Sequence, residues 1–166
     1  MIEPLWLSVG RAFVGIQEVA GPASNPIILR WARDIGAPSW YANDGQPWCA
    51  VWMNRLMKAC KKSMAGTGFE LLRAKTFESW GQKLRQPSLG AVLVFSRPEG
   101  AHVGLYLGET DTNYRVLGAN QSNAITEMWI AKPRLTAIRW PADEPLPTTG
   151  PVTVKADGQP VSQNEA

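Results

Sequence analysis

The sequence contains a single histidine, His102, and two cysteines, Cys49 and Cys60. Cys49 follows Pro47 at the predicted start of a helix, where unpaired backbone N–H groups and the helix dipole favour thiolate over thiol. His102 lies in Gly100–Tyr106, whose alternating pattern is typical of a strand. A thiolate at a helix N-terminus and an imidazole on a strand are the two groups that a cysteine-dependent hydrolase needs.

Each of these residues also has a purely structural interpretation. A cysteine on an apolar helix face is commonly inert, which is what we expect for Cys60, and His102 alone is equally compatible with an ordinary core or surface histidine. On one helix, Cys49 and Cys60 would lie roughly 16 Å apart, too far for a disulfide. Two cysteines and one histidine do not make a usual four-ligand zinc site. We therefore expect free thiols and neither a metal nor an organic cofactor.

An amide group is available to orient the imidazole. The strand after His102 ends in Gly118-Ala119-Asn120-Gln121, and an amide on a neighbouring strand can contact the far ring nitrogen, the third role in a Cys-His-polar triad. The sequence predicts Asn120 in this role, with Gln121 second, so that one ring nitrogen faces Cys49 and the other Asn120. Asn120 as a turn residue after the strand is the structural alternative.

The remaining pattern predicts an α+β fold. Apolar spacing and start and stop signals predict helices first, and short apolar runs bounded by turn residues then predict an antiparallel meander. N-terminal helices should pack on a roughly five-stranded antiparallel sheet. The predicted helices are 5–16, 26–35, 49–60 and 77–81, and the predicted strands are 91–95, 103–107, 114–117, 125–130 and 135–140.

Composition limits the other possibilities. The formal charge of +3 and pI near 9.0 are mildly basic, which is too weak to indicate nucleic acid as a partner. No apolar run reaches the roughly 20 residues of a membrane span, and the N-terminus lacks the features of a secretory signal, so we expect no membrane insertion and no signal peptide. From residue 141 onward, Pro and small polar residues dominate. We therefore expect a hydrolase domain over 1–141 and a tail or linker over 142–166, mobile unless docked.

Candidate substrate contacts are mainly aromatic, because aromatic rings stack on sugars and apolar peptide stems. Trp48, beside Cys49, and Tyr106, on the His102 face of its strand, are the first candidates, followed by Trp40, with Gln121 as a polar candidate. A position in the core is the alternative for each aromatic residue.

Other residues near the predicted helix starts also have open roles. Glu18 and Asp44 are candidates either for contacting a substrate amine or for capping a helix, and capping is favoured for Asp44. The backbone N–H of Cys49 is a donor for an oxyanion, with Gln46 or Asn43 as candidates for a second donor.

Six blocks of the sequence, in this order, resemble a phage and prophage group in the NlpC/P60–CHAP superfamily of papain-like cysteine peptidases and amidases. They are Glu18-Val19-Ala20-Gly21, Asn25-Pro26-x-Ile28, Pro47-Trp48-Cys49-Ala50 with Asn54, Pro87-x-x-Gly90-Ala91-Val92, His102-Val103-Gly104-x-Tyr106-x-Gly108 and Leu117-Gly118-x-Asn120-Gln121-Ser122. The resemblance covers about residues 5 to 141. Two positions depart from the usual pattern, Ala91 in place of Asp and Ala119 in place of Gly, and neither is catalytic in the motif.

The resemblance implies a papain-like NlpC/P60 fold with Cys49 as nucleophile, His102 as general base and then acid, and Asn120 as the polar third member. It also implies bacterial peptidoglycan as the substrate, cut as an N-acetylmuramoyl-L-alanine amidase or a stem-peptide endopeptidase. Such a protein is made in the host cytoplasm and acts on the cell wall or periplasm, either after holin release as an endolysin or as part of a virion with phage tail proteins as partners. The alternatives are a tail component that uses the fold mainly for docking, and an injected antibacterial amidase toxin.

Overall fold

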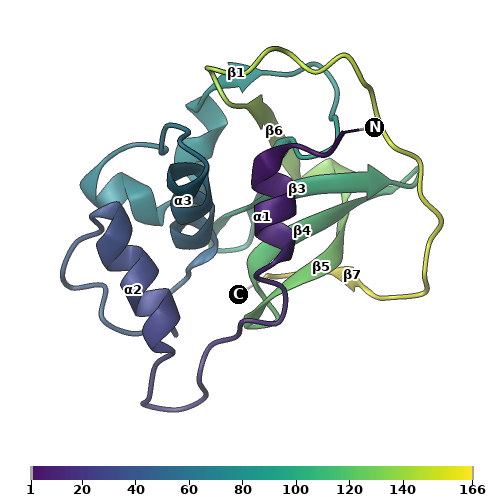
Figure 1. The fold of residues 1–166 in the computed structure, drawn as a ribbon. Coiled ribbons are helices and arrows are strands. Elements are labelled where there is room, and N and C mark those ends of the chain that lie inside the picture. The colour runs from purple at the N-terminus through teal and green to yellow at the C-terminus, as the bar shows by residue number, and fades with distance from the viewer. Residues whose placement is uncertain (1, 166) are drawn as a thin grey trace.

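The computed structural model describes residues 2–165, which form an α+β fold with helices grouped on one side of a long sheet (Figure 1). The described residues contain three α-helices, three short 3-10 helices and seven strands. In chain order these are α1 (Leu5–Arg11), α2 (Pro26–Ile35), α3 (Cys49–Ala59), η1 (Gly68–Leu72), η2 (Ala74–Ser79), β1 (Gln82–Lys83), β2 (Val92–Arg97), β3 (Gly100–Glu109), β4 (Asn113–Gln121), β5 (Ala124–Ala131), η3 (Lys132–Arg134), β6 (Leu135–Trp140) and β7 (Val161–Ser162).

Helix α2 begins and ends where its sequence signals predict. The Asn25 side chain accepts a hydrogen bond from the Ile27 backbone N–H, and Pro26 occupies the first helical position. Gly36 ends the helix with φ of 80°, a left-handed conformation that glycine adopts without a steric penalty. The predicted helix over 5–16 is shorter, because α1 ends at Arg11 and turns follow.

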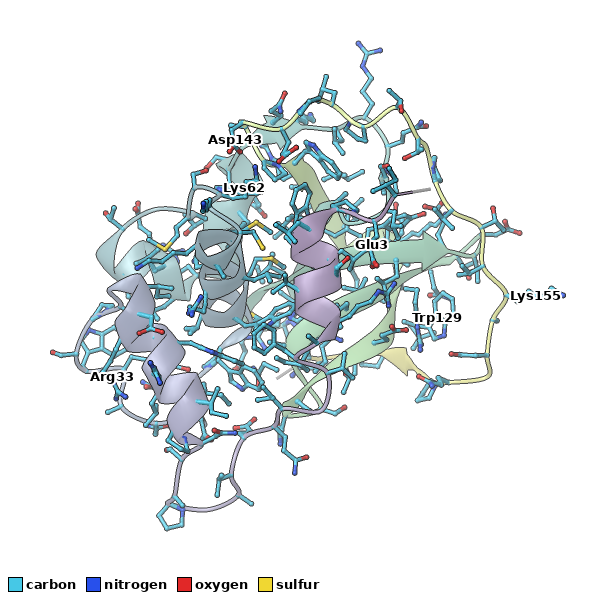
Figure 2. The ribbon with its side chains drawn as sticks, viewed as in Figure 1. Glu3, Arg33, Lys62, Trp129, Asp143 and Lys155 are labelled. Carbon is cyan, nitrogen blue, oxygen red and sulfur yellow. The ribbon has the colours of Figure 1, made fainter. Side chains whose placement is uncertain are left out.

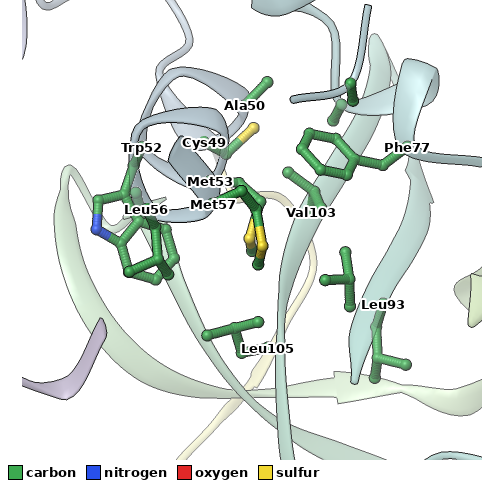
Figure 3. Packing of buried hydrophobic residues seen from close by; sticks show 14 of the residues in the cluster. Cys49, Ala50, Trp52, Met53, Leu56, Met57, Phe77, Leu93, Val103 and Leu105 are labelled. Atoms are coloured by element: carbon green, nitrogen blue, oxygen red, sulfur yellow. The ribbon is translucent and has the colours of Figure 1, made fainter. Parts of the chain in front are cut away.

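Helix α3 lies at the centre of the molecule and is buried along most of its length. Met53, Leu56 and Met57 point from α3 toward Val103 and Leu105 of strand β3, and all five side chains are at most 2% exposed (Figure 3). An apolar surface that continues around a helix requires neighbours on several sides, and α1, α2 and the sheet supply them. The first turn of α3, which carries Cys49, is thereby fixed against β3.

The sheet differs from the prediction. It has seven strands in the order β1-β6-β2-β3-β4-β5-β7, and it is mixed, because β7 pairs with β5 in parallel while the other neighbouring strands pair antiparallel. The expectation of a roughly five-stranded antiparallel sheet, and with it the papain-like description of the fold, is therefore wrong, although the α+β class is correct. The five predicted strands correspond to β2 through β6, whereas the two added edge strands have two residues each, too few to show an alternating pattern.

The segment after residue 141 lies against the rest of the protein. It runs from the end of β6 around the outside of the sheet to β7, drawn in yellow in Figure 1. Lys62 contacts Asp143 at 3.1 Å near its start (Figure 2), and the Trp129 indole N–H donates to Asp157 at 2.7 Å farther along. Val161–Ser162 then add the parallel edge strand. No helix within residues 2–165 has the length and apolar character needed to cross a membrane.

Candidate active site

Cys49 is the first residue of α3, and its thiol faces strand β3 (Figure 3). Trp48, rather than Pro47, is the residue that caps the helix, and its side chain makes no capping hydrogen bond. The N–H groups of the first turn have no partner within a helix. Backbone N–H groups of Val103 and Ala50 donate to the Cys49 sulfur, which places the thiol against the residue that follows His102.

The His102 imidazole is held in one orientation by Gln121 of β4. The His102 Nε2 and Gln121 Oε1 atoms are 3.0 Å apart. The Gln121 amide nitrogen donates to the Thr126 carbonyl oxygen at 2.6 Å, so its oxygen faces the ring as an acceptor. A neutral imidazole that donates from Nε2 has its lone pair on Nδ1. Nδ1 is thus the ring atom whose lone pair is free to act as a base.

The third member expected from the sequence, Asn120, does not make this contact in the structure. A regular continuation of the β3–β4 register from Leu105 opposite Leu117 would place Asn120 opposite His102. The strand pairing is instead irregular after Gly118, and Asn120 has a left-handed φ of 57°. This bulge brings the next residue, Gln121, to the imidazole. Gln121 was predicted as a substrate contact, but it is fully buried and contacts His102. Its role in the structure is therefore to position the imidazole.

Gly118 is a part of the site that the sequence analysis missed. A Cβ at this position would lie 2.6 Å from Gln121 Oε1 and 3.1 Å from His102 Nε2. The hydrogen bond between these two side chains therefore depends on the absence of a side chain at position 118. In the sequence, Gly118 stood out only as a glycine directly after the predicted strand 114–117 and as a member of the last motif block; a glycine in a strand is typical of a bulge or a close approach.

Burial determines the protonation of both reactive groups. Cys49 is 3% exposed and His102 is 1% exposed. Burial raises the pKa of the Cys49 thiol, although Arg97 and the two backbone N–H donors act in the opposite direction. Burial lowers the pKa of His102 to about 4, against the charge of Glu165 and the hydrogen bond with Gln121. Near neutral pH the pair is therefore an uncharged thiol and an uncharged imidazole.

A cavity of about 310 Å³ opens onto Cys49, and most of the charged residues that line it are basic. Arg73, Lys75 and Arg97 supply three positive charges against the single carboxylate of Glu99. Arg97 is close enough to Cys49 to lower the pKa of the thiol, and its buried Nε has no hydrogen-bond partner in the described chain. The cavity suits a ligand with negatively charged groups.

Of the predicted aromatic contacts, only Trp40 is placed to meet a ligand. Trp48 and Tyr106 are both 0% exposed, and the Tyr106 hydroxyl donates to Glu109 at 2.8 Å, so both are core residues and the predicted substrate contacts are corrected. Trp40 is 55% exposed and lies 5.9 Å from Phe69, between ring centroids. Both rings line a hollow of about 180 Å³ that shares Pro47, Leu72 and Arg73 with the Cys49 cavity and also includes Gln46.

The two acidic candidates lie at a separate cavity of about 500 Å³ that also includes Asn43. The Asp44 carboxylate accepts hydrogen bonds from the backbone N–H groups of Val19 at 2.9 Å and Asn25 at 2.7 Å, so its role is to join two loops at the start of α2. Burial and the nearby Asp44 raise the pKa of Glu18. The capping role favoured for Asp44 is wrong, because Asn25 caps α2 and no side chain caps α3.

Within residues 2–165, no three or more His, Cys, Asp or Glu side chains form a group that could hold a metal ion. Both cysteines are free thiols. No model of a known protein family matches the sequence, and no curated protein matches it significantly. The residues of the site therefore carry the functional proposal.

Proposed function

We propose that the protein is a cysteine-dependent hydrolase of amide bonds in bacterial peptidoglycan. The observation that carries the reaction class is the oriented imidazole. Gln121 fixes the His102 tautomer with Nδ1 as the base, and the adjacent Val103 contacts the Cys49 thiol at the start of a helix. A thiol, a base and a group that orients the base are the parts required for nucleophilic attack on a carbonyl.

The reaction proceeds in two stages, formation of a thioester on Cys49 and its hydrolysis by water. Nδ1 of His102 takes the Cys49 proton as the sulfur attacks the amide carbonyl, and N–H groups of the first turn of α3 stabilise the oxyanion. The intermediate collapses to a thioester as His102 donates its proton to the leaving amine. Water, deprotonated by His102, then hydrolyses the thioester and gives a carboxylic acid and the free thiol.

Two features support a peptidoglycan stem as the substrate. The basic wall formed by Arg73, Lys75 and Arg97 matches the carboxylates of stem peptides, and the exposed ring of Trp40 offers a surface for a sugar or an apolar stem residue. The motif resemblance to the NlpC/P60–CHAP superfamily selects peptidoglycan among amide substrates. An N-acetylmuramoyl-L-alanine amidase and a stem-peptide endopeptidase both fit, in an endolysin or a virion-associated lysin.

The test is muropeptide release from purified sacculi, followed by mass spectrometry. Cys49→Ser should reduce release at least about a hundredfold, since a hydroxyl is a far weaker nucleophile than a thiolate. Cys60→Ser is the matched control, because Cys60 lies at the other end of α3, and this variant should retain wild-type turnover. The new termini in the products tell amidase from endopeptidase. Wild-type turnover by Cys49→Ser would exclude the proposal, and intact sacculi with the wild-type protein would favour a docking role.

A further inference from the structure

The last described residue of the chain, Glu165, is a fully buried carboxylate. Its charge raises the pKa values of both His102 and Cys49, although burial has the larger effect on each. Glutamate is rarely buried unless it is paired. Glu165 is paired with Arg134, Arg134 donates to Ser96, and strand β2 pairs Ser96 with Ala101, the residue before His102. A carboxylate from the C-terminal segment is thus buried near the β2–β3 hairpin that carries His102.

Arg134 binds this carboxylate with both arms of its guanidinium. Its Nη1 and Nη2 atoms donate to the two Glu165 oxygens at 2.7 Å each, and the Ser162 hydroxyl adds a third hydrogen bond at 2.8 Å. Burial alone would raise the pKa of Glu165, but these bonds and the adjacent His102 bring the pKa below its usual range. The bidentate geometry is the arrangement that gives arginine its preference for carboxylates.

The Arg134 guanidinium is also positioned independently of the C-terminal segment. Its Nε donates to the Ser96 carbonyl oxygen at 3.0 Å, and the Ser96 hydroxyl donates to the Arg134 carbonyl oxygen at 3.3 Å. These two bonds tie η3 to Ser96, near the end of β2. The next and last residue of β2 is Arg97, which lines the Cys49 cavity. The guanidinium fork would therefore stay in place if Glu165 left.

We propose that Arg134 forms a carboxylate-binding subsite beside His102 and that residues Val161–Glu165 act as an internal competitor, with Glu165 in the place of a substrate carboxylate. This inference rests on the proposed function for the identity of the substrate, a peptide with a free carboxylate. While the segment is docked, the catalytic pair is covered. A carboxylate that displaces Glu165 from Arg134 both occupies the subsite and uncovers the pair.

The full-length variant Glu165→Gln tests the competitor without using peptidoglycan. It removes the charge but preserves the shape of the side chain, so the segment should dock more weakly. Alkylation of Cys49 by iodoacetamide, followed by peptide mass spectrometry, should become about tenfold faster, as expected when a hydrogen bond between charged groups is lost. Cys60, buried at the far end of α3, is an internal reference that should keep its rate.

Glu144→Gln is the matched control. Glu144 lies in the same C-terminal segment as Glu165 and also forms an ion pair, with Lys62, and its substitution should leave the alkylation rate of Cys49 unchanged. An unchanged or slower Cys49 rate in Glu165→Gln would overturn the proposal, because Glu165 would then not cover the thiol. Equal acceleration of Cys49 and Cys60 would also overturn it, since it would show general loosening of the fold.

The subsite is tested with N-acetylglutamate as a small carboxylate probe. Because the chain has one histidine, its imidazole gives a single set of NMR signals. The probe should shift these signals in Glu165→Gln at lower concentration than in the wild-type protein or Glu144→Gln, with chloride at equal ionic strength as the blank. The absence of a shift in Glu165→Gln would exclude a carboxylate subsite. Either result is independent of whether sacculi are hydrolysed.

Discussion

His102→Gln should reduce the loss of stability that acid causes in this protein. Burial lowers the pKa of His102 from 6.5 to about 4, aided by Arg97 and Arg134 and opposed by Glu165 and Gln121. The unfolded chain therefore binds a proton near pH 6.5 that the folded protein excludes until the pH approaches 4, so stability is lost as the pH falls between these values. Each pH unit corresponds to about 1.4 kcal/mol, which gives about 3 kcal/mol across the interval.

Urea unfolding followed by tryptophan fluorescence at about pH 7 and about pH 5 measures this effect. Between these conditions, wild type should lose about 2 kcal/mol more of the free energy of unfolding than His102→Gln. The difference between the two proteins isolates His102, because both contain the same carboxylates. NMR titration of the single imidazole should place its pKa near 4. If both proteins lost the same stability and the ring titrated near 6.5, His102 would not be buried as an uncharged group.

Three further substitutions test other parts of the site. Gly118→Ala should separate His102 from Gln121 and lower muropeptide release about a hundredfold, the scale of general acid–base catalysis; unaltered release would show that their contact does not matter. Trp40→Ala should raise KM for sacculi about threefold to tenfold through lost stacking, with kcat and Tm unchanged, and an unaltered KM would remove Trp40 from the binding surface. Asp44→Ala should lower the free energy of unfolding by about 2–3 kcal/mol, because two backbone N–H groups lose a charged and buried acceptor, whereas urea curves matching wild type would contradict its structural role.

Local sequence signals were sufficient for much of the framework. Asn25-Pro26 and Gly36 determine where α2 begins and ends, and the five longer strands follow apolar runs that turn residues separate. These signals depend on backbone groups and side chains within a few residues of one another. For the same reason, Cys49 at a helix start and His102 on a strand were predictable without a structure.

Pairing between strands decided which amide reaches the imidazole. The sequence presents Asn120 and Gln121 side by side, and regular alternation favours Asn120. The irregular β4–β5 pairing and the left-handed conformation of Asn120 give the contact to Gln121. A one-residue bulge changes the face on which each following side chain lies. Whether a bulge forms depends on the strand that pairs with the segment, and a local sequence pattern does not contain that information.

Tertiary structure also decided burial and the path of the C-terminal segment. Trp48 and Trp40 are the same residue type eight positions apart, yet one is 0% exposed and the other 55% exposed. The polar composition after residue 141 predicted a tail, while Arg134 and strand β5 determine where that tail docks. Composition and spacing thus determined which groups are available for chemistry. Long-range packing alone determined which of them meet, because burial and ion pairing depend on residues that are far apart in the chain.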